Sequence, residues 1–285
     1  MSFNPEYILL ALAPVFFLFI FWEWRWLQRH PELTNAQYSL KDTVSNATLA
    51  FLHQVGELIA AVAILSVYTW FFDWRLFDIP MTWWSLAFAF VLQDFLYYWF
   101  HRCSHQIRWL WAAHVVHHSS EHLNFSTAFR QSLMYPVAGM WAFWIPMAVV
   151  GFAPETIIMV VLLNLGYQFF VHTQAVRRLG VLEHIFNTPS HHRVHHASNP
   201  EYIDRNYAGV LIIWDKFFGT FVPEQDDNPC VYGITKPVRT HNPITLTFHE
   251  WRDMLRDATA PNKRWQDRIG HLVKRPDWAP QESNK

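Results

Sequence analysis

Two closely spaced histidine motifs occupy the stretch from residue 101 to residue 118, which reads HRCSHQIRWLWAAHVVHH, and a third motif at residues 191–196 reads HHRVHH. Histidines three or four positions apart lie on one face of a helix, and imidazole is the commonest nitrogen ligand for Zn, Fe and Cu. The eight histidines with this spacing are His101, His105, His114, His117, His118, His192, His195 and His196. Each motif is expected to form one metal-binding surface, and together they suffice for two metal ions.

The composition is that of a membrane protein. Of the 285 residues, 52% are hydrophobic, including 16 Trp and 24 Phe, and only 16% are charged. The two cysteines exclude a disulfide framework and a cysteine-rich metal site, so the metal ligands must be nitrogen and oxygen atoms. A net charge of −1 gives no reason to expect nucleic-acid binding.

Several apolar stretches approach the roughly 20 residues that a helix needs to span a bilayer. They cover about residues 7–22, 47–72, 81–100, 133–152 and 155–170. The sequence therefore predicts an all-α protein with about four to five membrane segments, capped by a helical, histidine-rich domain that holds two metals. The turn at residues 151–154 makes the last two stretches a hairpin, which could also be a re-entrant pair.

The N-terminal stretch is expected to be a membrane anchor. It has no basic leader and no small-residue cleavage site, and Trp22, Trp24 and Trp26 at its end resemble an interfacial belt. With the N-terminus outside, the segments 23–46 and 101–131 face inward. Their basic residues are Arg25, Arg29, Lys41, Arg102, Arg108 and Arg130, whereas the outer loops offer only Arg75. This asymmetry places the histidine motifs on the cytoplasmic side.

The chain is expected to have three parts. Residues 1–80 form N-terminal anchor helices, residues 81–224 form a catalytic core of membrane helices and histidine motifs, and residues 225–285 form a polar tail. The tail has no catalytic signature. We expect it to lie on the membrane surface or to meet a reductase.

Polar residues near the motifs are candidates for catalysis. Asp94 and Tyr98 lie on the same helical stripe as His101 and His105, and an aspartate in an apolar segment is costly unless it is paired. Asp94 is expected either to orient a ligand imidazole or only to bond a neighbouring helix. Three further candidates are Glu121, Asn124 and His191.

A ninth ligand is expected at the inner end of the fifth apolar stretch. His172 lies there, level with the motifs, and Gln168 one turn before it is a weaker candidate for an oxygen ligand. In the third motif, Thr188 suits the position before a helix and Pro189 the first helical position. A helix is therefore expected to begin there and to present the histidines of the third motif on one face.

These motifs resemble those of the fatty acid hydroxylase and sterol desaturase superfamily of integral-membrane oxygenases. The resemblance extends from about residue 94 to residue 224 and includes the long stretches HHSSE, NFSTAFRQS, QFFVHT and NTPSHHRVHH. It implies a non-haem di-iron centre, O2 as oxidant and a lipid substrate that enters from the bilayer, such as an alkylglycerol ether lipid, a sterol or a fatty acyl chain. The reaction would be hydroxylation or desaturation of a C–H bond.

The stretches are most similar to the branch of that superfamily that oxidises ether lipids, which implies tetrahydrobiopterin as the reductant. That branch carries an acidic residue directly after the first histidine motif, where this chain has Gln106. No nucleotide fingerprint or haem-attachment motif is present, so the electrons must come from a separate donor. A pterin, a cytochrome and a ferredoxin system are the three candidate electron donors.

Two other classes of protein are alternatives. A membrane zinc hydrolase would be expected to show a His-Glu-x-x-His motif, which the sequence lacks. A metal transporter would place its polar ligands at mid-membrane along a pathway, whereas here they are expected at one surface.

Overall fold

The structure is a computed structural model that describes residues 7–280, and within this range every regular element is a helix. Pairings between extended segments are limited to isolated bridges. The α-helices are α1 (Tyr7–Leu27), α2 (Leu40–Asp73), α3 (Trp83–Gln106), α4 (Arg108–His118), α5 (Tyr135–Ala138), α6 (Ile145–Val150), α7 (Pro154–Phe169), α8 (Pro189–His195), α9 (Ile213–Phe218), α10 (Pro243–Thr259) and α11 (Trp265–Val273). The short 3-10 helices are η1 (Phe125–Phe129), η2 (Met140–Trp144) and η3 (Gly180–His184).

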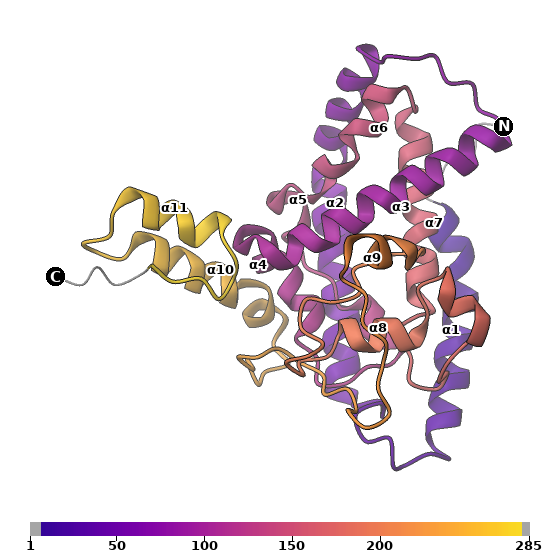
Figure 1. The fold of residues 1–285 in the computed structure, drawn as a ribbon, viewed down its shortest axis with the longest axis vertical. Helices are drawn as coiled ribbons and strands as arrows, with labels where there is room; N and C mark the ends of the chain where they lie inside the picture. The colour runs from indigo at the N-terminus through magenta and orange to yellow at the C-terminus, as the bar shows by residue number, and fades with distance from the viewer. Residues whose placement is uncertain (1–6, 281–285) are drawn as a thin grey trace.

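The long helices α1, α2, α3 and α7 form the frame of the molecule (Figure 1). Helix α3 packs against both α4 and α7, and α1 packs against α7. Within residues 7–280, α2 is the one helix whose length and hydropathy suffice to cross a membrane. The all-helical prediction is confirmed, whereas the four to five membrane crossings stay a prediction.

The fourth apolar stretch is not a single helix, and this part of the prediction is wrong. Residues 135–150 form the three short helices α5, η2 and α6. Pro136 and Pro146 each occupy the start of a helical turn, and Gly139 ends α5 in a left-handed conformation with φ of 79°. Glycine allows positive φ, so α5 ends at Gly139, whereas η2 continues directly into α6.

The histidine motifs lie on three separate helices. The first motif ends α3, and the second lies on α4, which begins after the single extended residue Ile107. Helix α8 carries the third motif and begins at Pro189, with Thr188 in an extended conformation before it, as predicted. The Thr188 hydroxyl bonds the Glu183 carboxylate (3.0 Å) and not the backbone of the helix.

The C-terminal helices α10 and α11 pack on α4 and project to one side of the molecule (Figure 1). Two ion pairs fix this arrangement, because the Arg108 guanidinium lies 2.7 Å from Glu250 and 2.9 Å from Asp257. Trp109 and Trp251 pack edge to face, with ring centroids 4.8 Å apart. The segment predicted as a polar tail is thus joined to the helix that carries the second histidine motif.

The hairpin between α6 and α7 depends on Gly151. Its φ is 129°, and a methyl group added there would lie 2.1 Å from the Phe77 carbonyl oxygen. At Gly139 the φ is 79°, but a methyl group would meet nothing within 4 Å. Both residues need positive φ, and only Gly151 also needs the space.

Gly151→Ala is therefore expected to destabilise the protein more than Gly139→Ala. The second change costs only the left-handed backbone penalty, about 1–2 kcal/mol, whereas the first adds a steric clash. Thermal unfolding in detergent measures both variants, and equal shifts in the unfolding midpoint would contradict the close packing of the hairpin against residue 77.

Candidate metal centre

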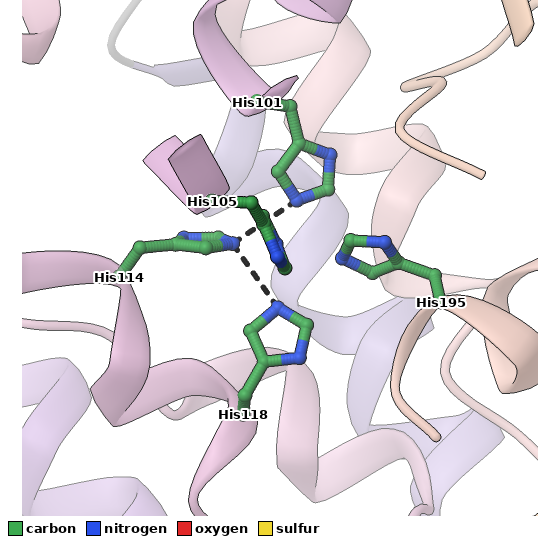
Figure 2. Close-up of side chains that lie close together, drawn as sticks. All are labelled: His101, His105, His114, His118 and His195. Carbon is green, nitrogen blue, oxygen red and sulfur yellow. Dashed lines mark hydrogen bonds between the residues drawn. The ribbon is translucent and has the colours of Figure 1, made fainter. Parts of the chain in front are cut away.

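The nine histidines predicted as ligands form two compact groups that could each hold a metal ion. In each group the candidate ligand atoms all lie within 4.8 Å of one another. Group one, drawn in Figure 2, is His101, His105, His114, His118 and His195. Group two is His117, His172, His192 and His196.

Each group combines histidines from several motifs, so the expectation of one metal-binding surface for each motif is wrong. The five rings of Figure 2 come from α3, α4 and α8 and converge on a common point. The neighbours His117 and His118 belong to different groups, because adjacent residues on a helix point about 100° apart. The third motif divides in the same way, with His195 in group one and His192 in group two.

The spacing of the ring nitrogens suits a metal ion. The Nε2 atoms of His117 and His172 lie 3.1 Å apart, and those of His172 and His192 lie 2.9 Å apart. In group one, His114 Nε2 lies 3.0 Å from His101 Nε2 and 3.1 Å from His118 Nε2. With metal–nitrogen bonds of about 2.1 Å, ligands at right angles to one another stand about 3 Å apart.

The hydrogen bonds of the opposite ring nitrogens show that these contacts need a cation. A carbonyl oxygen can only accept, so His117 Nδ1 donates to the Arg130 carbonyl (3.1 Å) and His172 Nδ1 to the Gln168 carbonyl (2.7 Å). In a neutral imidazole the other nitrogen then carries a lone pair. Two lone pairs face each other between His117 and His172, an arrangement that a bound metal ion stabilises.

Other buried nitrogens also fit metal binding. His105 Nε2 and His195 Nε2 are buried and have no hydrogen-bond partner among the described residues. A buried polar atom left unpaired costs free energy, and a metal ion is the partner that a lone pair in this cluster can find. The chemistry of the donor set therefore fits a metal that prefers nitrogen ligands.

The environment keeps the imidazoles neutral. Burial, and then repulsion from neighbouring imidazoles, holds the pKa of His114, His118 and His196 well below the ordinary value. Burial also lowers the pKa of His172 to about 4. Neutral imidazole is the form that binds metals, so these four histidines are in their metal-binding form at neutral pH.

One short segment, residues 204–207, holds three of the five histidines of group one. His101 Nδ1 donates to the Tyr207 carbonyl (2.8 Å), and His195 Nδ1 donates to the Arg205 carbonyl (3.0 Å). His105 Nδ1 lies 3.4 Å from the Asp204 carboxylate. These contacts fix the orientation of each ring, which metal-ligating histidines generally require.

Asp94 holds the backbone that follows this segment, at residues 210–211, and its hydrogen bonds do not include a histidine. Its carboxylate accepts hydrogen bonds from the backbone N–H groups of Val210 (2.8 Å) and Leu211 (3.0 Å). It also accepts from the side chains of Asn164 (2.9 Å) and Trp214 (2.9 Å). The prediction that Asp94 orients a ligand imidazole directly is wrong, because its bonds are with α7 and the segment that follows residue 207.

The other predicted catalytic residues are not members of either group. Asn124 caps η1, since its side chain accepts a hydrogen bond from the Ser126 N–H (3.1 Å) and donates to the Ala36 carbonyl (3.0 Å). The Glu121 side chain is exposed. His191 is buried next to Phe221, and burial lowers its pKa to about 4. Catalytic roles for Asn124, Glu121 and His191 stay predictions.

Gln168 is a support and not a member of the groups. The side-chain amide of Gln168 donates to the Asn164 side chain (2.6 Å) and accepts from the Tyr97 hydroxyl (2.8 Å). Its backbone carbonyl accepts from His172 Nδ1 and orients that ring. The weaker candidacy of Gln168 as an oxygen ligand therefore finds no support in the described contacts.

Two buried residues that the sequence analysis did not select also support the groups. The Arg130 side chain, 1% exposed, bonds Asn46 (2.8 Å) and forms an ion pair with Asp42 (3.2 Å) on α2. Asp215 accepts from the N–H groups of Tyr207 and Ala208, both at 2.8 Å. Both residues could have been selected from the sequence as charged residues within an apolar fold, which is the reasoning that selected Asp94.

The two groups lie directly beside each other. The rings of His118 in group one and His196 in group two are stacked, with centroids 4.5 Å apart. The rings of His192 and His195 also stack across the boundary, at 5.4 Å. Metal ions held by the two groups would therefore be close neighbours.

Comparison with known proteins agrees with this geometry. The family model described as fatty acid hydroxylase matches residues 86–220, which include every histidine of both groups. Over these residues, the chain is similar to the fatty acid hydroxylase family. No solved structure matches the chain.

Curated relatives extend the similarity beyond the domain. Human alkylglycerol monooxygenase is 42% identical over 85% of this chain and 54% of its own length. The zebrafish (Danio rerio) protein of the same name is 39% identical over 85% of this chain and 53% of its own length. The ornithine lipid hydroxylase of Rhizobium tropici is 29% identical over 54% of this chain and 48% of its own length. The chain thus spans about half the length of the curated relatives it matches.

Loss of one histidine from group two is expected to lower the metal content of the purified protein. His117→Ala removes a nitrogen that faces His172, so about one metal ion per chain should be lost or bound much more weakly. His184→Ala is the matched control, because His184 belongs to neither group. Elemental analysis measures both variants, and equal metal content would contradict a role for group two.

Breaking the buried ion pair of Arg130 is expected to destabilise the fold. Arg130→Ala removes the guanidinium from Asp42, whose remaining hydrogen bonds come from the neutral side chains of Asn46 and Ser120, and breaking a buried ion pair in this way typically costs about 3–5 kcal/mol. Arg177→Ala is the control, since Arg177 forms an exposed pair with Asp226 and such pairs contribute little. Chemical or thermal unfolding distinguishes them, and similar stability of the two variants would refute the importance of the Arg130 contacts.

Proposed function

We propose that this protein is a membrane-bound non-haem di-iron monooxygenase that uses O2 to hydroxylate a C–H bond of a lipid. The observation that supports this most strongly is the pair of adjacent all-histidine groups, with ring nitrogens about 3 Å apart. Iron held there would supply the activation of O2, a chemistry that side chains alone cannot provide. The nine histidines of the two groups are the proposed ligands.

The proposed role of the protein's own residues is to bind the metal ions, orient the histidine rings and shield the centre from water. Carbonyl oxygens of residues 130, 168, 205 and 207 fix the histidine rings, and burial of the histidines keeps bulk water from the centre. Asp94 and Asp215 hold the 204–211 segment by accepting backbone hydrogen bonds. We assign these two aspartates to positioning.

The proposed location is an integral membrane protein with several crossings. Helix α2 exposes large apolar side chains along its length, including Phe51, Leu58, Ile59, Val62 and Leu65. Exposed apolar surface of this extent is typical of a helix that faces lipid. We propose that α1, α3 and α7 accompany α2 and that the histidine groups lie on the cytoplasmic side, where the distribution of basic residues places them.

The proposed substrate is a lipid that enters from the bilayer. The names of the relatives mention alkylglycerol and ornithine lipid, and a cholesterol 25-hydroxylase-like protein of Danio rerio is 30% identical over 48% of this chain. The greater identity to the alkylglycerol monooxygenases favours an alkylglycerol ether lipid over a sterol or an acyl chain. Oxidation of the alkyl carbon next to the ether oxygen would then lead to cleavage of the ether.

A separate electron donor completes the proposal. Tetrahydrobiopterin, a cytochrome and a ferredoxin system are the three candidates, and Gln106 stands where the pterin-using branch has an acidic residue. Gln106 lines an open hollow of about 500 Å³ together with residues of the C-terminal segment. Supplying each donor in turn to the purified enzyme identifies the reductant.

The alternatives are less well supported. A zinc hydrolase would need a carboxylate among its ligands or as its base, and within residues 7–280 both groups consist of histidine alone. A transporter would need ligands along a path, whereas these form one compact centre. The similarity to monooxygenases and hydroxylases also favours the oxygenase.

The proposed activity predicts O2-dependent loss of an alkylglycerol lipid. Purified protein loaded with Fe²⁺ and supplied with a reductant should consume O2 and convert the lipid, and His118→Ala should lose this activity, since it removes one ligand of group one. In cells, the lipid profile of a deletion strain should be restored by the wild-type gene but not by the variant. Identical profiles for all three strains, together with no O2 uptake in vitro, would refute the proposal.

A further inference from the structure

Asp204 makes the one side-chain carboxylate contact to a histidine of the two groups within residues 7–280. Its Oδ1 lies 3.4 Å from His105 Nδ1, while the rings of His101 and His195 are held by backbone carbonyls. His105 Nε2, on the opposite side of the ring, is buried and has no hydrogen-bond partner. The ring thus lies between a carboxylate and the point where group one converges.

The other oxygen of Asp204 is held from the C-terminal segment. Arg275 donates from its guanidinium to Asp204 Oδ2 at 2.5 Å. Exposure falls along this chain of contacts: the Arg275 side chain is 52% exposed, that of Asp204 is 19% and that of His105 is 6%. The three residues therefore form a path from the surface to the histidine group.

The position of Arg275 is fixed by the backbone around it. The preceding residue, Lys274, accepts a hydrogen bond at its carbonyl from the Arg108 N–H (2.9 Å) at the start of α4. Trp278 N–H bonds the Arg275 carbonyl (3.0 Å), and the Trp278 ring packs against Gly270 of α11. A surface arginine held in this way differs from one on a free tail, because less entropy is lost when it forms the ion pair.

Asp204 also has an uncommon backbone conformation. Its φ is 60°, and Asn206 two residues later has φ of 54°. Non-glycine residues at positive φ cost free energy and persist where surrounding contacts hold them, often at functional sites. Here the strained segment is the one that holds three histidines of group one.

We propose that Arg275 and Asp204 are positioning residues for the metal centre, with Arg275 fixing the Asp204 carboxylate and Asp204 orienting His105. A carboxylate on one nitrogen of a ligand histidine sets its tautomer and raises the basicity of the other nitrogen. The C-terminal segment, which lies outside the matched hydroxylase domain, is then part of the centre. The inference rests on the proposed binding of metal by group one.

The test is metal affinity of the full-length chain in detergent, measured by competition with a chelator, with Co²⁺ as the probe. Arg275→Ala and Asp204→Asn should weaken one of two bound ions by about 10- to 100-fold, the usual effect of losing such a partner, and should leave the other ion unchanged. The visible absorption of bound Co²⁺ should also change, because the geometry at His105 changes. Arg275→Lys, which keeps the positive charge, should restore part of the affinity.

Asp277→Asn is the matched control. Asp277 also pairs with Arg275, at 3.4 Å, but it is 78% exposed and has no histidine partner among the described contacts. The affinity of the Asp277→Asn variant for Co²⁺ should equal that of the wild type. Comparing the unfolding of the metal-free proteins shows whether a variant has simply lost its fold. If Arg275→Ala does not fold, Asp204→Asn still tests the proposal, because it keeps the size of the side chain.

The outcomes distinguish the positioning role of Arg275 and Asp204 from the proposed di-iron function. If the wild type binds no metal, the proposed di-iron function fails. If the wild type binds two Co²⁺ ions and both Arg275→Ala and Asp204→Asn bind them with unchanged affinity and absorption, the positioning role is wrong while the metal centre stands. An equal loss of affinity in Asp277→Asn would also overturn it, because the effect would then not require contact with His105.

Discussion

The structure depends on the burial of nine imidazoles in mutual contact. Where Nδ1 donates to a carbonyl oxygen, Nε2 presents a lone pair to its neighbours, and in group two such lone pairs meet at 3.1 Å. This arrangement costs free energy unless a cation lies between the rings. The helices, the positively charged Arg130 and the strained 204–207 segment all serve to hold these rings in place.

The supports for the rings come from parts of the chain that are far apart in sequence. Arg130 joins His117 to α2 through Asp42, while Asp94 joins α3 to the backbone at residues 210–211. The C-terminal segment reaches His105 through Asp204. A rigid centre therefore requires the whole helical frame, and changes distant from the histidines can alter metal binding.

The ligand candidates could be predicted because their spacing is local. Positions three and four apart share a helix face, so the motifs and the start of α8 at Pro189 were visible in sequence. The role of Asp94 could not be predicted, because its backbone partners Val210 and Leu211 lie over a hundred residues away on a loop without periodicity. The broken fourth segment was missed because its apolar composition resembles a membrane helix, while Gly139 ends α5 in a left-handed conformation.

The sequence by itself determined which residues gather at the centre, an all-helical fold and a similarity to the fatty acid hydroxylase family. Only the tertiary structure decided how the histidines divide. His117 and His118 are neighbours in the chain, yet they point about 100° apart and join different groups, and which partners each meets depends on how α3, α4, α7 and α8 cross. Helix crossing is set by long-range packing, which local spacing does not encode.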